Sequence, residues 1–112
     1  MHDHEQDDQG RQICTTSGEP VEKVRAEQTE KTGQHKGYIV LCADERAKGF
    51  VRPYRDVYTH KACGTSTTMG RALSETYARD PSFYGATFCV SCNAHYPVAE
   101  FTWRADGEQV GS

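Results

Sequence analysis

Large aliphatic residues are scarce in this sequence. Isoleucine, leucine, valine and phenylalanine together supply 16 of the 112 residues, which is below the level of about 20% at which disorder becomes common. High net charge, the usual companion of disorder, is also lacking, because the formal charge is only −3. A chain this small and this poor in aliphatic residues is expected to need a metal ion, disulfides or a partner to stabilise its core.

Long hydrophobic runs are missing as well. No run of about 18 apolar residues occurs, so we expect no transmembrane helix and no membrane partner. Residues 1–10 are polar and acidic, whereas a secretory signal needs an apolar central region. We therefore expect a cytoplasmic protein.

Aromatic residues are absent from residues 1–36, which carry eight acidic and five basic side chains. Such a segment buries too little surface to offset the entropy lost on ordering. We therefore predict a flexible acidic tail over residues 1–36, with a short helix over residues 21–29 as its one structured part. Residues 37–112 hold all the aromatic residues and balanced charge, and they form the predicted folded domain.

Patterning within residues 37–112 predicts a mixed α+β fold. The clearest helix spans residues 66–79, where apolar side chains recur at helical spacing, Ser66 or Thr67 can cap the first turn, and Pro81 follows the last. The Asp-Gly pair at residues 106–107 predicts a hairpin between residues 98–104 and 108–110. Predicted extended segments are residues 38–42, residues 86–89, and residues 50–58 as an edge strand or loop because of Pro53.

The aromatic side chains are expected to provide most of the buried area, because so few aliphatic residues are present. We assign them to the core and give them no ligand-binding role. They are Tyr77, Phe83, Tyr84, Phe88, Tyr96, Phe101 and Trp103.

Cysteine and histidine fall into two local motifs of equal spacing. One is His60-Lys-Ala-Cys63-Gly, and the other is Cys89-Val-Ser-Cys92-Asn. The glycine or asparagine after each pair tolerates a left-handed backbone, so that a tight turn can direct both side chains at one ion. Four such ligands satisfy tetrahedral Zn²⁺. We therefore predict a zinc site formed by His60, Cys63, Cys89 and Cys92.

Two alternative ligands stay open. Cys42 supplies the fourth thiolate if His60 is an ordinary polar residue, and His95 repeats the three-residue spacing after Cys92. His95 is better explained as a histidine beside the site or at the surface. A site with four protein ligands leaves no coordination position for water, so we expect it to stabilise the fold rather than hydrolyse a substrate.

Other chemistries fit these cysteines less well. Thioredoxin-like redox motifs precede a helix, but Pro97 soon follows Cys92. A disulfide framework is disfavoured by the odd number of cysteines and the lack of a signal segment. A zinc deaminase needs His-x-Glu and Pro-Cys-x-x-Cys elements, and neither occurs. A metal-dependent nuclease needs oxygen ligands beside a base such as His60 or His95, and the acidic residues of the predicted domain are scattered singly.

A basic and aromatic strip runs through residues 46–61. Arginine and lysine can contact phosphates while aromatic rings stack on the bases of a single strand. An edge strand with its rings turned inward explains the same pattern, and the net charge of −3 argues against a broad phosphate-binding surface. The residues of this alternative nucleic-acid site are Arg52, Tyr54, Arg55, Tyr58 and Lys61.

A longer pattern spans residues 37–112. It comprises Tyr58-Thr-His60, Cys63-Gly64, Thr67-Thr-Met69, Glu75-Thr-Tyr77-Ala-Arg79-Asp-Pro81, Phe83-Tyr-Gly85, Cys89-x-x-Cys92-x-x-His95-x-Pro97 and Glu100-Phe-x-Trp103. In this pattern the chain resembles small zinc-binding proteins encoded by tailed phages and prophages. The resemblance implies zinc binding at the His60, Cys63, Cys89 and Cys92 positions and a location in a bacterial host, and the family has no established activity.

The sequence thus predicts a small, zinc-ribbon-like α+β domain, with one helix against a short antiparallel sheet. The expected function is a non-catalytic binding module whose partner is a host or phage protein, for example as an inhibitor of host machinery or defence. Nucleic acid is the alternative partner. A nuclease or a thiol oxidoreductase is a third hypothesis, and a small-molecule substrate is not expected.

Overall fold

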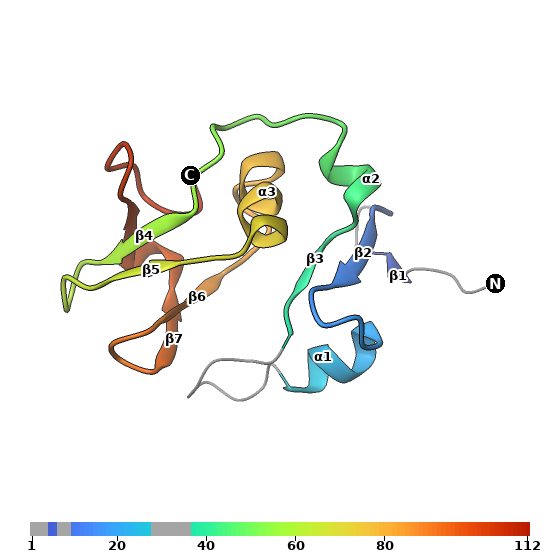
Figure 1. The fold of residues 1–112 in the computed structure, drawn as a ribbon, viewed down its shortest axis with the longest axis horizontal. Helices are drawn as coiled ribbons and strands as arrows, with labels where there is room; N and C mark the ends of the chain where they lie inside the picture. The colour runs from blue at the N-terminus through green and yellow to red at the C-terminus, as the bar shows by residue number, and fades with distance from the viewer. Residues whose placement is uncertain (1–4, 7–9, 28–36) are drawn as a thin grey trace.

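The structure is a computed structural model, and it describes residues 5–6, 10–27 and 37–112. Two groups of antiparallel strands lie on either side of one central helix (Figure 1). In chain order the elements are β1 (Glu5–Gln6), β2 (Gln12–Thr15), α1 (Val21–Glu27), β3 (Ile39–Leu41), α2 (Ala43–Arg46), β4 (Val57–His60), β5 (Ser66–Thr68), α3 (Arg71–Arg79), β6 (Ala86–Cys89), β7 (Ala94–Pro97), the 3₁₀ turn η1 (Val98–Glu100) and β8 (Phe101–Trp103). The expected mixed α+β class is confirmed. None of the described helices is long and apolar enough to span a membrane.

The first sheet has the order β1-β2-β3 and joins residues from both sides of the predicted domain boundary. Ile13 lies opposite Leu41, and α1 packs against both β2 and β3. Apolar side chains from all three elements form one buried cluster. These are Ile13, Val21, Val24, Ile39 and Leu41, with Phe83 packed against them.

The prediction of a flexible tail over residues 1–36 is therefore wrong for residues 10–27. This segment supplies three of the cluster's buried side chains, and β3 supplies the other buried ones. The segment is therefore ordered by pairing with β3, which lies beyond the predicted boundary. The helix expected over residues 21–29 is confirmed as α1. Residues 1–4, 7–9 and 28–36 lie outside the described residues.

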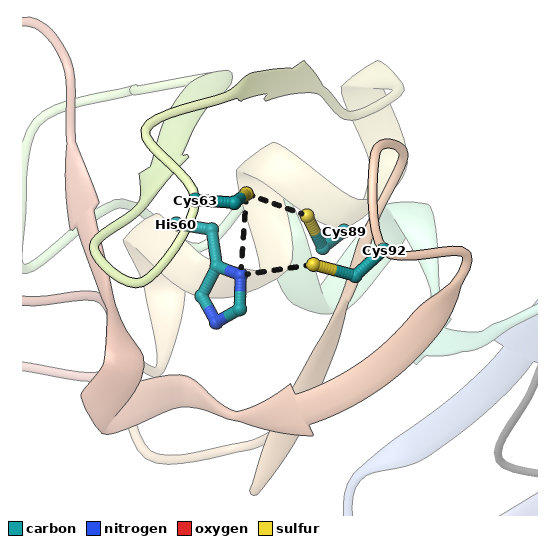
Figure 2. Close-up of side chains that lie close together, drawn as sticks. All are labelled: His60, Cys63, Cys89 and Cys92. Carbon is teal, nitrogen blue, oxygen red and sulfur yellow. Dashed lines mark hydrogen bonds between the residues drawn. The ribbon is translucent and has the colours of Figure 1, made fainter.

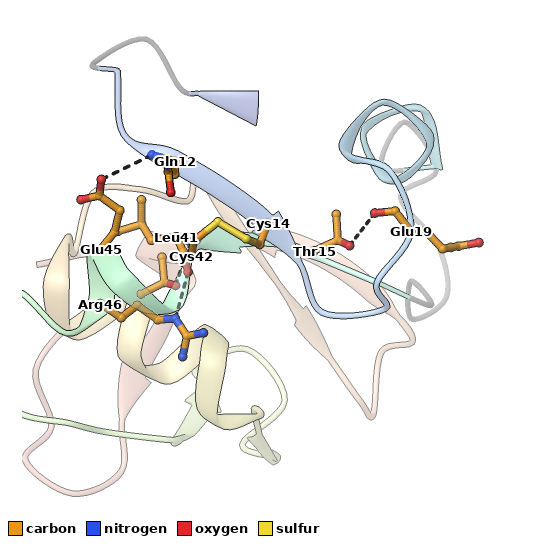
Figure 3. The surroundings of a disulfide bond; sticks show 9 residues. Gln12, Cys14, Thr15, Glu19, Leu41, Cys42, Glu45 and Arg46 are labelled. Carbon is orange, nitrogen blue, oxygen red and sulfur yellow. Dashed lines mark hydrogen bonds between the residues drawn. A yellow bond between two sulfur atoms is a disulfide. The ribbon is translucent and has the colours of Figure 1, made fainter. Parts of the chain in front are cut away.

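A disulfide between Cys14 and Cys42 joins β2 to the residue that follows β3 (Figure 3). The backbone N–H of Cys42 also donates to the carbonyl of Gln12. The argument against disulfides from an odd cysteine count is wrong for this pair, because the antiparallel register brings the two residues to a Cα–Cα distance of 5.0 Å.

The second sheet has the order β5-β4-β8, and β6 and β7 form a separate hairpin. Tyr58 on the central strand β4 lies opposite Thr67 on one side and Trp103 on the other. The predicted strand over residues 86–89 is confirmed as β6, and the apolar segment 38–42 contains β3. Of the two alternatives for residues 50–58, the loop is confirmed for residues 50–56. The edge strand is wrong, because Val57 and Tyr58 belong to β4, which is the central strand of its sheet.

The predicted helix over residues 66–79 begins later than expected. Ser66–Thr68 is extended and pairs with β4, and the helix starts at Arg71 after Gly70 as N-cap. The hydroxyls in this segment are used between strands, since Thr67 Oγ1 accepts a hydrogen bond from the N–H of Val90. Serine and threonine therefore extend the sheet here instead of capping the helix.

The hairpin at residues 106–107 is confirmed in a shortened form. Gly107 N–H donates to the carbonyl of Trp103, and Val110 N–H donates to that of Phe101. The first strand is shorter than predicted, because residues 98–100 form η1.

Aromatic side chains make up most of the second core, as predicted. The rings of Tyr58 and Tyr77 both meet Trp103 edge-on, with centroids 6.2 and 5.4 Å apart. Such contacts add to the free energy gained from burial alone. The buried members are Tyr58, Met69, Tyr77, Cys89, Phe101, Trp103 and Val110, and the partly buried Tyr84 and Tyr96 pack against them.

Candidate metal centre

Two turns at one end of the second core bring a histidine and three cysteines together. His60 ends β4 and Cys63 follows it in the turn, while Cys89 ends β6 and Cys92 lies in the turn towards β7. Their side chains point at one another (Figure 2), and the four potential ligand atoms all lie within 4.8 Å of each other. Among the described residues, this is the one cluster of three or more such side chains that could hold a metal ion.

Each turn is closed in the way that the sequence motif predicts. The N–H of Gly64 donates to the carbonyl of His60 at 2.7 Å, and the N–H of Asn93 donates to that of Cys89 at 2.8 Å. Both closing residues have a left-handed backbone, with φ of 73° at Gly64 and 54° at Asn93. Glycine and asparagine adopt this conformation at little cost.

The distances between the donor atoms match a tetrahedral zinc site. Bond lengths of about 2.3 Å to sulfur and about 2.0 Å to nitrogen place two sulfurs about 3.8 Å apart, and a nitrogen about 3.6 Å from each sulfur. The structure has 3.5 Å between Cys63 Sγ and Cys89 Sγ. His60 Nδ1 lies 3.5 Å from Cys63 Sγ and 3.6 Å from Cys92 Sγ. These three distances are close to those of a tetrahedral site, and all four donor atoms lie within 4.8 Å of one another, so that small side-chain shifts would let the cluster hold a metal ion.

Glu100 fixes the orientation of the histidine. Its carboxylate lies 2.9 Å from His60 Nε2, so that Nε2 carries the proton it donates and Nδ1 is left to face the sulfurs. Phe101 stacks on the same ring with centroids 4.5 Å apart. A carboxylate on the second nitrogen of a metal-bound histidine holds the ring in place and increases its basicity. No local motif points to a role for Glu100, which belongs to the longer pattern of residues 37–112.

The local electrostatics favour a thiolate at Cys63. A hydrogen bond from the backbone N–H of Thr65 is the largest of the effects that lower the pKa of Cys63 to about 6, and contacts with Cys89 and His60 add to it. Hydrogen bonding to Cys89 contributes most to raising the pKa of Cys92, to about 11. Because thiolates are the form that binds metal, Cys63 is already prepared for an ion at neutral pH.

Burial and hydrogen bonding change the pKa of His60 in opposite directions. Burial alone lowers the pKa of His60, but the hydrogen bonds with Glu100 and Cys63 raise it above its ordinary value overall. In the absence of a cation the imidazole therefore tends to gain a proton beside Glu100 and Cys63. A metal ion would replace this proton as the positive charge in the cluster.

The cluster lies at the edge of the core and not deep inside it. His60 and Cys89 are buried, Cys92 is half-buried and Cys63 is exposed. Cys63 is thus open to solvent and Cys92 is partly so, while His60 and Cys89 are covered by the aromatic core.

The two alternative ligands lie elsewhere. Cys42 is bonded to Cys14, so its predicted role as fourth thiolate is wrong. His95 lies with its Nε2 3.2 Å from the hydroxyl of Tyr38, and its ring contacts Phe88. It is not part of the cluster, which agrees with its placement beside the site rather than in it.

The predicted nucleic-acid strip does not form one surface. Arg55 is buried, lies 5.0 Å from the Trp103 ring centroid, and pairs with Asp106 at 3.0 Å and Glu108 at 2.7 Å. Tyr58 is also buried and donates its hydroxyl proton to the carbonyl of Phe88. These two side chains were predicted to contact nucleic acid, but they are buried in the aromatic core, where Arg55 packs against Trp103 and Tyr58 fills space that aliphatic residues do not. Arg52, Tyr54 and Lys61 are exposed.

Comparisons with protein families, curated proteins and solved structures find no match to this chain. The chemistry of the site therefore has to be argued from its own geometry.

Proposed function

We propose that this chain is a non-catalytic binding module, held together by one Zn²⁺ in a zinc-ribbon-like pair of turns. The observation that carries the proposal is the spacing of the Cys63, Cys89 and Cys92 sulfurs and the His60 nitrogen, all within 4.8 Å. Three thiolates and one imidazole in a tetrahedral arrangement are typical of zinc.

A structural role follows from the number of protein ligands. Four protein donors fill the coordination sphere of tetrahedral zinc and leave no position for a substrate or an activated water. The ion would join the turn after β4 to the turn after β6, and metal binding of this kind can contribute about 10 kcal/mol to folding. That contribution would offset the shortage of aliphatic residues in the second core.

The proposed contact surface for a protein partner is the loop of residues 47–54, which is exposed throughout. It carries Phe50, Val51 and Tyr54, three of the large hydrophobic side chains that are exposed among the described residues. The loop backbone is held against the end of α3, because the N–H groups of Val51 and Arg52 both donate to the carbonyl of Ala78. Aromatic residues and arginine dominate protein interfaces, and a preorganised loop loses little entropy on binding.

A host or phage protein is therefore the proposed partner, and the cytoplasm of a bacterial host is the proposed location. A nucleic-acid partner is less favoured, because Arg55 and Tyr58 are buried and the net charge is −3. Disulfides persist mainly in oxidising compartments, so a cytoplasmic location predicts that thiol trapping in cells finds Cys14 and Cys42 reduced, and a disulfide trapped in cells would contradict that location.

Elemental mass spectrometry of the untagged protein tests the metal. We expect one zinc per chain in the parent, loss of zinc and of folding in His60→Ala and Cys89→Ser, and retention of zinc in the control variant His95→Ala. A folded parent without zinc would refute the proposal.

Affinity capture with paired variants tests the contact surface. A bound host protein should be lost with Phe50→Ala plus Tyr54→Ala and retained with Val90→Ala, which removes a similarly exposed side chain from the metal turn. Capture that survives the double variant, or binding of single-stranded oligonucleotides in place of a protein, would contradict the proposed partner.

A further inference from the structure

Two cysteines of the metal cluster are placed so that one is reachable from solvent and the other is not. Cys63 is exposed and Cys89 is fully buried behind it. Their sulfur atoms lie 3.5 Å apart, joined by a dashed line in Figure 2. Because a disulfide requires about 2.05 Å, a small side-chain movement would bring them to bonding distance.

We propose that Cys63 is an oxidation site, and that Cys63 and Cys89 form a redox pair whose closure expels the metal ion. The inference rests on the proposed zinc site, which supplies the ion that is released. It adds an oxidant-sensitive function to a site that would otherwise be purely structural.

The oxidant is a hydroperoxide, and the step balances as follows. The Cys63 thiolate attacks one peroxide oxygen and breaks the O–O bond, which leaves a sulfenic acid on Cys63 and, with one proton from solvent, one molecule of water or alcohol. The Cys89 thiolate then attacks the Cys63 sulfur and displaces hydroxide, which takes a second proton and leaves as water. Two thiolates have given up two electrons in total, and one S–S bond has formed.

Metal release follows from the number of donors that remain. After the bond forms, only His60 and Cys92 can still bind the ion, and two ligands cannot hold zinc against solvent and chelators. The half-buried Cys92 contacts His60 Nδ1 at 3.6 Å. Because Cys63 is exposed whereas Cys92 is half-buried, a hydroperoxide reaches Cys63 first, and the sulfur of Cys89 at 3.5 Å is then available to close the Cys63–Cys89 pair.

The molecule holds a second pair of cysteines, Cys14 and Cys42, in addition to the Cys63–Cys89 pair. Cys14 and Cys42 are joined, while Cys63, Cys89 and Cys92 remain thiols. Bound zinc would hold each sulfur of the cluster in its own coordination position, so that closure of Cys63 and Cys89 requires a hydroperoxide, whereas Cys14 and Cys42 are already joined. Zinc is thus expected to direct disulfide formation to Cys14 and Cys42.

The test uses the zinc-loaded full chain and increasing hydrogen peroxide, with a coloured chelator to detect free zinc and peptide mapping to identify disulfides. We expect about one zinc released per Cys63–Cys89 disulfide formed, and full recovery after addition of a thiol reductant and zinc. A Cys89–Cys92 disulfide, or release without any new disulfide, would overturn the proposal.

Two variants separate this inference from its premise. Cys63→His keeps four metal donors but removes the accessible thiolate that reacts with peroxide. Peroxide-induced zinc release from this variant should therefore be at least about tenfold slower than from the parent. Cys14→Ser plus Cys42→Ser should leave the release rate unchanged. If the parent holds no zinc, the proposed function fails, and peptide mapping of the oxidised chain still decides whether Cys63 pairs with Cys89. Release from Cys63→His at the parent rate would contradict the inference alone.

Discussion

At the scale of single residues, the site depends on how His60 is oriented. Nδ1 faces the sulfurs because Nε2 is held by Glu100 at 2.9 Å and because Phe101 stacks on the ring. The side chain of Glu100 is partly exposed to solvent. It can therefore be replaced without disrupting the core.

Replacing Glu100 should weaken zinc binding without unfolding the protein. Glu100→Gln removes the negative charge that increases the basicity of His60, and losses of such carboxylates typically reduce metal affinity about 10- to 100-fold. Competition with a chromophoric chelator measures the change, and the exposed Asp44→Asn serves as a charge-matched control. Equal affinity in the two variants would show that Glu100 does not act on the site.

Arg55 is expected to matter for stability and not for binding. It pairs with Asp106 and Glu108 while its guanidinium lies over Trp103. Arg55→Ala should therefore lower the free energy of unfolding by about 2 kcal/mol, the size of a buried hydrogen bond to a charged group. Chemical denaturation measures this, with the exposed Arg52→Ala expected to change stability by less than about 0.5 kcal/mol. Similar effects of the two variants would argue that Arg55 is not held as described.

At the scale of elements, the turns and strand pairs that carry the two cross-links are the important units. The turn after His60 and the turn after Cys89 have the same closing hydrogen bond and a left-handed residue at the same place. The pair of strands β2 and β3 carries the disulfide.

The two left-handed residues should respond differently to substitution. Gly64→Ala places a Cβ at φ of 73° and should destabilise the zinc-bound protein by about 1 kcal/mol, whereas Asn93→Gly removes a Cβ from a left-handed position and should be close to neutral. Thermal unfolding with zinc present gives both values. Destabilisation by Asn93→Gly larger than that by Gly64→Ala would contradict the turn geometry.

Removing the disulfide should loosen the first sheet and leave the metal site intact. The bond closes a loop with a sequence separation of 28, for which chain entropy predicts a loss of about 3–4 kcal/mol. Cys14→Ser plus Cys42→Ser should show faster amide exchange in β2 and β3 with an unchanged zinc content. Loss of zinc in this variant would show that the two halves are not independent.

At the scale of the whole molecule, contacts across α3 join the two cores. Arg11, which precedes β2, donates to Asp80 at the end of α3 at 2.8 Å, and its guanidinium lies 5.7 Å from the Phe83 ring centroid. Tyr84 donates its hydroxyl proton to the carbonyl of Ile39. These contacts link the first sheet to the part of the chain that carries the metal cluster.

The Arg11–Asp80 pair gives a pH dependence with a definite sign. Burial raises the pKa of Asp80, but hydrogen bonds from Arg11 and Ser82 outweigh it and lower the pKa overall. A lowered folded-state pKa means that the pair stabilises the protein fully above the unfolded value of about 3.9, and that this stability is lost as pH falls through the folded value.

Arg11→Gln should therefore raise the pKa of Asp80 and lower the free energy of unfolding at neutral pH by about 1 kcal/mol. The difference from the parent should shrink as Asp80 is protonated. Carboxyl ¹³C titration by NMR measures the pKa. An unchanged Asp80 pKa in the variant would show that Arg11 is not its partner in solution.

Local patterns in the sequence predicted the two turns of the metal cluster. They did not predict contacts between residues that are far apart in the chain. The spacing around Cys63 and Cys92 specifies which side chains can meet within one turn, because those contacts involve close neighbours. Glu100 lies 40 residues from His60 and Cys42 lies 28 residues from Cys14, so neither partnership is visible in any local pattern.

The predicted domain boundary failed for a related reason. Ile13, Val21 and Val24 are isolated apolar residues in a polar segment, and their burial depends on β3 across the sheet. Composition measures how much a segment can bury by itself. It cannot detect a segment that completes the core of another.

X-ray absorption at the zinc edge, on protein purified without a metal-binding tag, identifies the atoms that bind the proposed ion. We expect one zinc per chain with three sulfur neighbours at about 2.3 Å and one nitrogen neighbour at about 2.0 Å, and a change to two sulfurs and two nitrogens in Cys63→His. A zinc coordinated mainly by oxygen, or four sulfur neighbours with no nitrogen, would contradict the site formed by His60, Cys63, Cys89 and Cys92.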